Sequence, residues 1–272
     1  MKTRLDKLLV DRGLVPSRER AHALILAGKV LVDEQKISKA GASVSDGAAL
    51  RLLAPDLKYV SRGGLKLEKA LDHWRVPVEG RTCVDVGAST GGFTDCLLQR
   101  GAKLVLAIDT GYGQLDFALR QNPRVRLLEK TNARHLQPPD FEAALQQAAE
   151  APGPPAVNNT LPTTTRFANL IVMDVSFISA TLVLPAVIAS AFPSDPPERR
   201  GRQLIVLVKP QFEAGREHVG KGGIVHDESA QLASVEKVKA AVLALGAART
   251  DFIDSPILGA EGNREFLLYA EF

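Results

Sequence analysis

A glycine-rich turn is the first place where residue types and spacing suggest chemistry. An apolar stretch from Arg81 to Val86 runs into Gly87, and Gly91 and Gly92 follow in the spacing G-x-x-x-G-G before a helical pattern. Such a turn lets the backbone approach a nucleoside-type ligand closely. The pyrophosphate-binding spacing G-x-G-x-x-G is absent, so a nicotinamide enzyme is not indicated.

A carboxylate stands at a suitable distance from this turn. Asp109 follows the next apolar run, Leu104 to Ile108, and lies 22 residues beyond Gly87 (109 − 87). Dinucleotide folds place a ribose-binding carboxylate roughly 20 residues after the first turn glycine. Together the turn and the carboxylate favour an adenosine-containing ligand, and a purely structural strand, turn and helix is the alternative.

Two more polar residues directly follow apolar runs. Asp174 comes after the run 170–173, and Lys209 comes after the run 204–208. Open α/β sheets bind ligands in the crevice at the carboxyl ends of their strands, so both positions favour a site. The alternative is a buried ion pair with no other role, and Lys66, taken alone, is a surface lysine.

These runs also predict the elements that must position the site. Continuous apolar runs are typical of strands buried in a parallel sheet. We therefore predict an α/β fold, a Rossmann-like sheet with helices on both faces, over residues 81–272. Residues 59–80 are expected to form a linker and the first helix of the catalytic region. Residues 137–166, rich in Pro, Ala, Gln and Thr, are expected to form a flexible insertion that begins with a short helix.

The basic excess of the chain lies in its first segment. Residues 1–58 hold 11 Lys/Arg and 7 Asp/Glu, a net charge of +4, which leaves −1 for the remainder of a chain whose net charge is +3. The pattern predicts a small α+β module with two helices and a small sheet. Its basic residues are expected to contact the phosphates of an anionic partner, with a solvated charged surface as the alternative. They are Arg4, Lys7, Arg12, Arg18, Arg20 and Lys29.

Composition excludes several other classes. The charged start of the sequence is unlike a signal peptide, and no apolar run approaches the ~20 residues of a membrane span, so we expect a cytoplasmic protein without a membrane partner. Cys83 and Cys96 fit neither a disulfide framework nor a zinc site, so we expect buried small side chains and no metal. The stretch from Gly215 to Gly222 lacks the Ser or Thr that a P-loop needs to bind magnesium.

The first ~55 residues closely resemble the S4-type RNA-binding domain, whose size is normal for a small module. The resemblance is carried by Arg4–Leu9, Ser17–Ala21 and Ala27–Val32. In that family the helix pair and the loop after it bind structured RNA, and this implies an RNA-binding role for the basic residues above.

Nearly the whole chain resembles the TlyA family of ribosomal RNA 2′-O-ribose methyltransferases, some of which are named haemolysins. That family joins an S4-type domain (here 1–58) to an FtsJ-like methyltransferase domain (here 81–272). The matching runs are 60–67, 85–95, 109–115, 174–179, 208–213 and 262–266. The long insertion 137–166 departs from the family pattern.

The resemblance implies S-adenosyl-L-methionine as cofactor and a ribose of 16S or 23S ribosomal RNA, or of ribosomal subunits, as substrate, with cytidine as the expected nucleoside. It places the family's Lys-Asp-Lys-Glu tetrad on Lys66, Asp174, Lys209 and Glu265. The expected cofactor-binding residues are Asp85, Gly87, Ser89, Thr90, Gly91, Phe93, Asp109 and Asp174. Arg62 joins the expected RNA-binding residues.

The tetrad is chemically suited to this reaction. A ribose hydroxyl is a poor nucleophile at neutral pH, whereas a sulfonium methyl group is already activated, so the protein must orient the hydroxyl and help to remove its proton. Lys209 is the expected base, because burial and the neighbouring Lys66 both favour a neutral amine. Asp174 and Glu265 are expected to position the two amines, and Lys66 to stabilise the alkoxide.

Two alternatives belong to other classes. A membrane-acting haemolysin needs an apolar span or a strongly amphipathic segment, which this sequence lacks. An RNA-binding protein with an inactive methyltransferase domain needs the loss of the turn or the tetrad, and all of the matching positions are present.

Overall fold

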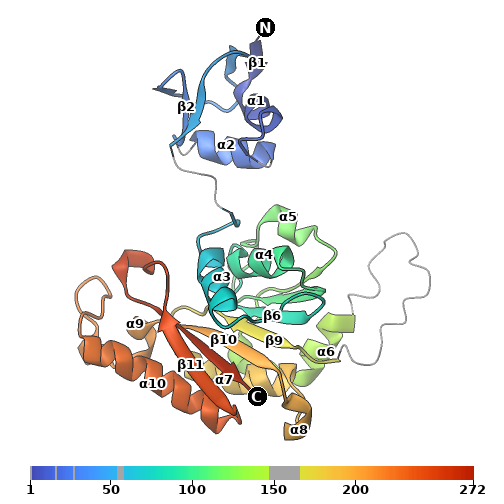
Figure 1. Ribbon diagram of the computed structural model, residues 1–272, viewed down its shortest axis with the longest axis vertical. Coiled ribbons are helices and arrows are strands. Elements are labelled where there is room, and N and C mark those ends of the chain that lie inside the picture. The colour runs from blue at the N-terminus through green and yellow to red at the C-terminus, as the bar shows by residue number, and fades with distance from the viewer. Residues whose placement is uncertain (1, 16, 27, 54–57, 147–165) are drawn as a thin grey trace, which may run out of the picture. The chain divides into compact units, whose positions relative to one another are not determined.

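The computed structural model describes residues 2–15, 17–26, 28–53, 58–146 and 166–272, and the chain divides into two compact units, Met1–Lys58 and Tyr59–Phe272 (Figure 1). Each unit has a hydrophobic core of its own. The core of the first unit uses residues between Leu5 and Leu52, whereas the two clusters of the second use residues from Tyr59 onward.

The first unit is a small α+β module, as predicted. Helices α1 (Leu5–Asp11) and α2 (Arg18–Leu26) pack together, and the strands form a two-stranded and a three-stranded sheet. The bounds are β1 (Lys2–Arg4) with β4 (Ser43–Ser45), and β3 (Gln35–Lys36), β2 (Val30–Val32) and β5 (Leu50–Leu52). Leu5, Leu8 and Leu9 recur on one face of α1 and are buried, because that face lies against the core.

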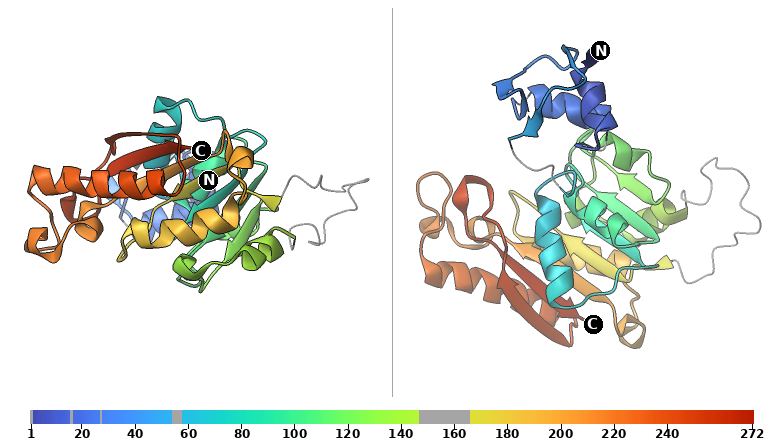
Figure 2. Two further views of the ribbon diagram at one scale, coloured as in Figure 1. Left: turned by 90° about the horizontal axis from the view of Figure 1, so that it is seen from below. Right: turned by 45° about the horizontal axis from the view of Figure 1, so that its top comes forward.

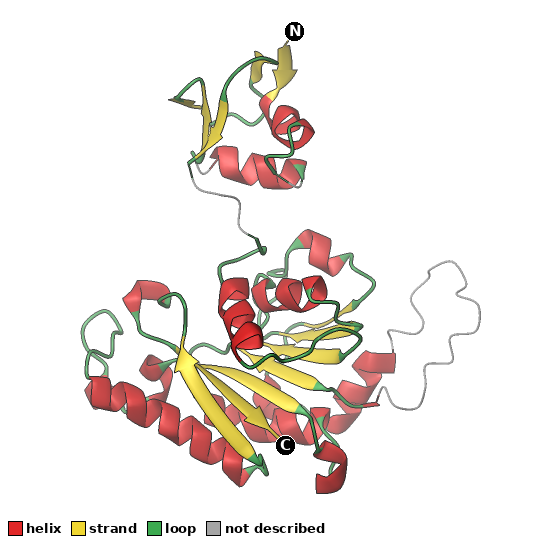
Figure 3. Ribbon diagram, in the orientation of Figure 1, coloured by secondary structure: helices red, strands yellow, loops and turns green. Residues whose placement is uncertain are grey.

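The second unit contains a seven-stranded sheet in the order β11-β12-β10-β9-β6-β7-β8. Figure 3 shows its strands in yellow and the helices around them in red. β12 pairs antiparallel with both β10 and β11, and the other neighbouring strands pair in parallel. The bounds are β6 (Thr82–Val86), β7 (Leu104–Ile108), β8 (Val125–Leu128), β9 (Leu170–Met173), β10 (Gln203–Val208), β11 (Arg249–Asp254) and β12 (Phe266–Glu271).

This strand order fixes the place of the site. The chain adds β7 and β8 on one side of β6 and then continues with β9 on the other side. The carboxyl ends of β6 and β9 therefore flank the topological switch point, where open α/β sheets bind their ligands.

Helices cover both faces of the sheet, as predicted (Figure 2). One face carries α3 (Gly63–His73), α4 (Gly92–Gln99) and α5 (Phe117–Arg120). The other carries α6 (Pro138–Gln146), α7 (Ala180–Ala191) and α10 (Glu228–Ala244). Shorter helices are α8 (Pro196–Arg199) and α9 (Pro210–Glu213), together with single turns at Ala133–His135, Arg216–His218 and Ala260–Gly262.

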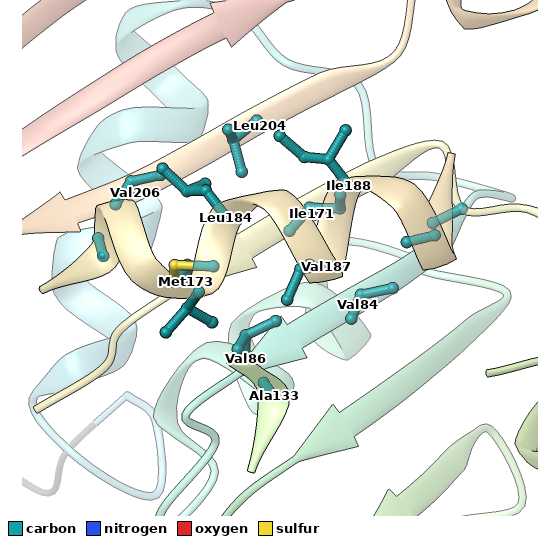
Figure 4. Close-up of a cluster of buried hydrophobic side chains, with 14 of the residues drawn as sticks. Val84, Val86, Ala133, Ile171, Met173, Leu184, Val187, Ile188, Leu204 and Val206 are labelled. Atoms are coloured by element: carbon teal, nitrogen blue, oxygen red, sulfur yellow. The ribbon is translucent and has the colours of Figure 1, made fainter. Parts of the chain in front are cut away.

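The core beneath α7 shows why these runs become strands. Val84, Ile171 and Val206 from three neighbouring strands meet Leu184 and Val187 of α7 (Figure 4). Alternate residues of each strand face the opposite helical layer, where both Cys83 and Cys96 are fully buried and free of disulfides. A strand with apolar neighbours on both faces needs an unbroken apolar run.

The predicted insertion is only partly described. Its first residues form α6, in agreement with the expected short helix, and Phe141 and Leu145 of α6 are buried. Residues 147–165 of the insertion lie outside the described residues.

Candidate active site

The glycine turn after β6 has a backbone shape that requires glycine at its first position. Gly87 has φ +84°, and a Cβ there would collide with the backbone carbonyl oxygen of Asp174. The ends of β6 and β9 thus approach more closely than any side chain allows. Gly91 has φ +99° and directly precedes α4. The predicted close-approach turn is therefore present where the strand order places the ligand crevice.

Asp109 holds this turn from the neighbouring strand. The backbone N–H of Ser89 donates to Asp109 Oδ2 at 2.8 Å, and that of Gly111 donates to Oδ1 at 2.6 Å. Ser89 has φ +48°, a conformation that few residues other than glycine adopt. Asp109 therefore fixes the turn, and its carboxylate also lines a cavity of about 290 Å³.

Two cavities meet at the switch point. The smaller extends past Asp109 toward the end of β8, and a larger one of about 650 Å³ contains the whole predicted tetrad. Five residues line both: Gly87, Ser89, Asp174, Ser176 and Phe177. Two bound molecules could therefore approach each other beside Asp174.

The tetrad forms two ion pairs in the larger cavity. Lys209 Nζ lies 2.5 Å from Asp174 Oδ1 and donates to Ser176 Oγ at 2.8 Å. Lys66 Nζ donates to Glu265 Oε2 at 2.5 Å. The side chains of both lysines are about one-tenth exposed, at 10% for Lys209 and 11% for Lys66. Each amine thus pairs with its own carboxylate.

Each ion pair joins two elements that are far apart in the sequence. Lys66 lies on α3, whose buried residues Leu67, Ala70 and Leu71 hold it against the sheet. Glu265 precedes β12, 199 residues further along the chain. Asp174 and Lys209 follow the neighbouring parallel strands β9 and β10. The fold brings together all four predicted catalytic residues.

The predicted cofactor-binding residues divide into two groups. Those that line at least one of the two cavities are Gly87, Ser89, Thr90, Phe93, Asp109 and Asp174. Gly91 and Asp85 line neither of these two cavities. Asp85 is fully buried and accepts a hydrogen bond from Thr94 Oγ1 at 2.6 Å. This contact joins β6 to α4, the helix that follows the glycine turn.

Burial raises the pKa of Asp85 to about 7. The folded protein therefore holds a proton on Asp85 between about pH 4 and 7 that the unfolded chain has released, and stability falls as the pH rises through this range. We expect the isosteric Asp85→Asn variant to lose this fall and to exceed the wild type by up to about 4 kcal/mol above pH 7. Urea unfolding of both proteins from pH 5 to 9 measures the difference, and parallel curves would contradict the buried proton.

Sequence reasoning missed several residues that line the cavities. In the smaller cavity they are Thr110, Gln114, Thr131, Asn132 and Ser176. The rule that uses strand ends could have found Thr131 and Asn132, because they follow β8. β8 itself gives no continuous apolar run, because Arg126 interrupts it.

Phe177 is the most unusual of the missed residues. It lines both cavities, is 91% exposed and has φ +65°, which is rare for a bulky residue. Its ring lies 5.5 Å from that of Phe212, centroid to centroid. A strained backbone that holds an aromatic ring in solvent beside a site is typical of a ligand contact.

The predicted RNA-binding residues of the first unit differ from one another in their partners and in their exposure. The guanidinium groups of Arg4 and Arg18 both donate to the buried Asp6, at 2.9 Å, and these contacts hold the pKa of Asp6 well below its usual range. Both arginine side chains remain 56% exposed, and Lys7 and Lys29 are exposed.

Two of these predicted RNA-binding residues differ from the rest. Arg12 donates to the carbonyl oxygens of Ala48, at 2.7 Å, and of Asp46, so its guanidinium holds the turn before β5. Arg20 is half-buried. In the second unit, Arg62 is exposed at the wall of the larger cavity.

Residues 59–272 match the FtsJ-like methyltransferase family, and residues 3–50 match the S4 domain. The chain is 42% identical over 269 residues to the 16S/23S rRNA (cytidine-2′-O)-methyltransferase TlyA of Mycobacterium tuberculosis, with 98% of this chain and 89% of that protein covered. The chain belongs to the TlyA family of FtsJ-like methyltransferases. These matches confirm the family that the sequence motifs indicated, and they confirm the expected methyltransferase.

Two other TlyA-family relatives carry haemolysin names. Hemolysin A of Brachyspira hyodysenteriae is 36% identical, with 98% of each chain covered. A solved structure of a haemolysin-named protein from Streptococcus thermophilus is 41% identical, with a TM-score of 0.66 over 99% of this chain and 88% of that one. Among the described residues of this TlyA-family chain, no helix is both long and apolar enough to cross a membrane.

Proposed function

We propose that this enzyme transfers the methyl group of S-adenosyl-L-methionine to the 2′-hydroxyl of a cytidine ribose in 16S or 23S ribosomal RNA. The observation that carries the proposal is the place of the Lys209–Asp174 pair, where a nucleoside-sized cavity joins a larger one. The name of the Mycobacterium tuberculosis relative supports the nucleoside and both RNAs.

The residues present fit the cofactor. Gly87 and Ser89 of the turn line the smaller cavity, and the acidic Asp109 lines it beside them. Asp109 would hold the ribose hydroxyls, and Asn132, together with Thr131, would lie along the nucleoside. When bound, S-adenosyl-L-methionine supplies a methyl group that is already activated by its sulfonium.

The protein's own residues then act on the RNA hydroxyl. Asp174 and Ser176 hold the Lys209 amine at the junction of the cavities, where it orients the hydroxyl and accepts its proton as the methyl group is transferred. The Lys66 ammonium, held by Glu265, stabilises the negative charge that develops on the ribose oxygen. Phe177 offers an exposed ring on which an unpaired base can stack.

The first unit supplies affinity for the RNA. Arg4 and Arg18 are oriented by a single buried carboxylate and keep much of their surface exposed, an arrangement that suits contact with backbone phosphates. Arg62 extends this role to the wall of the catalytic cavity.

Mass spectrometry of ribosomal RNA from cells with and without the protein tests the proposal directly. We expect a ribose methyl group on a cytidine only when the protein is present, and in vitro reactions with naked RNA and with each ribosomal subunit identify the substrate. Identical RNA from both kinds of cell, together with no transfer to any of these substrates, would contradict the proposed function.

The cofactor site has a separate test. We expect Asp109→Asn to weaken S-adenosyl-L-methionine binding about 10- to 100-fold, because a hydrogen bond to a charged group contributes ~1.5–3 kcal/mol. Asp116→Asn is a matched control, since Asp116 lies in the same loop, accepts a backbone N–H from Ala118 at 2.9 Å and lines neither cavity. Calorimetry that finds equal affinities for the two variants would exclude Asp109 from the cofactor site.

A further inference from the structure

A buried carboxylate outside the tetrad joins the two loops that carry Asp174 and Lys209. Glu213 is the last residue of α9, four residues after Lys209, and its side chain is 2% exposed. Ser179 Oγ donates to Glu213 Oε2 at 2.5 Å, and the backbone N–H of Ala180 donates to Oε1 at 2.6 Å. Ser179 lies five residues after Asp174, so the contact bridges the loops that follow β9 and β10.

This contact is the far end of a series of three. Lys209 meets Asp174 and Ser176 at the strand ends. The rings of Phe177 and Phe212 meet between them. The segments 174–179 and 209–213 are therefore held side by side along their length, and a displacement at Glu213 shifts the residues that hold the Lys209 amine.

The charge of Glu213 has its own compensation, separate from the tetrad. The N-terminus of α7, where Ser179 is the N-cap, carries partial positive charge. Lys237 of α10 lies 3.3 Å from Glu213 Oε2 and donates to the Glu213 carbonyl oxygen at 2.8 Å. Burying a carboxylate is costly unless it is paired in this way.

The N-terminus of α7 has a cap besides this carboxylate. Ser179 accepts the N–H of Thr181 at 3.3 Å, as an N-cap Ser normally does. The buried charge also joins two loops that meet at the Lys209–Asp174 pair and at the Phe177–Phe212 pair.

We infer that Glu213 is a positioning residue for methyl transfer, which fixes the Asp174 loop against the Lys209 loop. The inference rests on the proposed function. Because Glu213 lines neither of the two cavities, it acts on the rate of transfer at saturation and not on the affinity for RNA or cofactor.

The test uses single-turnover methyl transfer with the full-length protein, ribosomal RNA and S-adenosyl-L-methionine. Glu213→Gln keeps the size of the side chain and removes its charge. We expect the rate at saturation to fall about 10-fold or more, as when a catalytic group is slightly misplaced. The KM for RNA, the KM for the cofactor and the thermal unfolding temperature should change little. If Glu213 served only stability, Glu213→Gln would instead lower the unfolding temperature and leave the saturated rate of the folded enzyme unchanged.

A second variant leaves Glu213 itself unchanged and serves as the test if Glu213→Gln does not fold. Lys237→Met removes the partner of the carboxylate, and Lys239→Met on the same helix removes a lysine whose partner is the exposed Glu236. We expect a several-fold lower saturated rate for Lys237→Met and no change for Lys239→Met. Wild-type rates in both Glu213→Gln and Lys237→Met would overturn the inference, whereas a wild-type enzyme that modifies no RNA would overturn the proposed function itself.

Discussion

Lys209→Met is expected to lower the rate of methyl transfer by ~100-fold or more, the effect typical of losing a positioned acid-base group. Methionine keeps an unbranched apolar stem of similar length but has no amine to receive the hydroxyl proton. Affinity for RNA and for S-adenosyl-L-methionine should change little, because Lys209 is assigned to the chemical step. Single-turnover transfer at saturating RNA measures the rate without a contribution from product release.

The structure adds a necessary control to this experiment. Without the amine, Asp174 loses its partner at 2.5 Å and Ser176 loses a donor at 2.8 Å, so the loop can loosen. Thermal unfolding must therefore be recorded beside the rate, and Lys239→Met serves as the surface control. A folded Lys209→Met enzyme with a near-normal rate would show that the lysine is only a member of an ion pair.

Removal of residues 1–58 is expected to leave cofactor binding intact and to weaken binding to ribosomal RNA strongly. The second unit keeps its complete sheet and both of its hydrophobic clusters, because the first unit contributes no residue to them. The slope of log affinity against log salt should become shallower by roughly 1 for each lost phosphate contact, so by about 3 to 4 if Arg4, Arg18, Lys7 and Lys29 are such contacts.

A pair of substitutions separates charge from the loss of the whole module. Arg4→Gln combined with Arg18→Gln removes the two guanidinium groups around Asp6, and Arg51→Gln removes an equally exposed arginine that pairs with Glu34. Filter binding at several salt concentrations should show weaker binding and a shallower slope for the double variant alone. A truncated enzyme that binds and methylates RNA as well as the intact one at physiological salt would assign the module another role.

The strands that the sequence predicts are those with a continuous apolar run. The runs 104–108 and 170–173 are apolar throughout because both faces of β7 and β9 are buried, and the strands coincide with these runs. β11 was not predicted, because it lies at the edge of the sheet and its burial changes from residue to residue without an apolar run.

The site was predictable only in part from spacing. Asp109, Asp174 and Lys209 are predictable because each directly follows an apolar run, whereas Glu265 precedes its strand and only the family resemblance indicates it. Asp85 lies within β6, and a strand buried on both faces gives no sign in its sequence of which side chains face a ligand. Arg12 shows another limit, because its partner is a backbone carbonyl 36 residues away.

The order in which β11 and β12 enter the sheet has a consequence for how the enzyme is made. β12 follows β11 along the chain but lies between β10 and β11 in the sheet, and Glu265 immediately precedes it. During synthesis the edge of β10 that pairs with β12 therefore lacks its partner strand until β12 has left the ribosome. Lys66 likewise has no Glu265 to pair with until 199 further residues have been made. A nascent chain can thus complete the glycine turn and the Asp174–Lys209 pair before the Lys66–Glu265 pair exists.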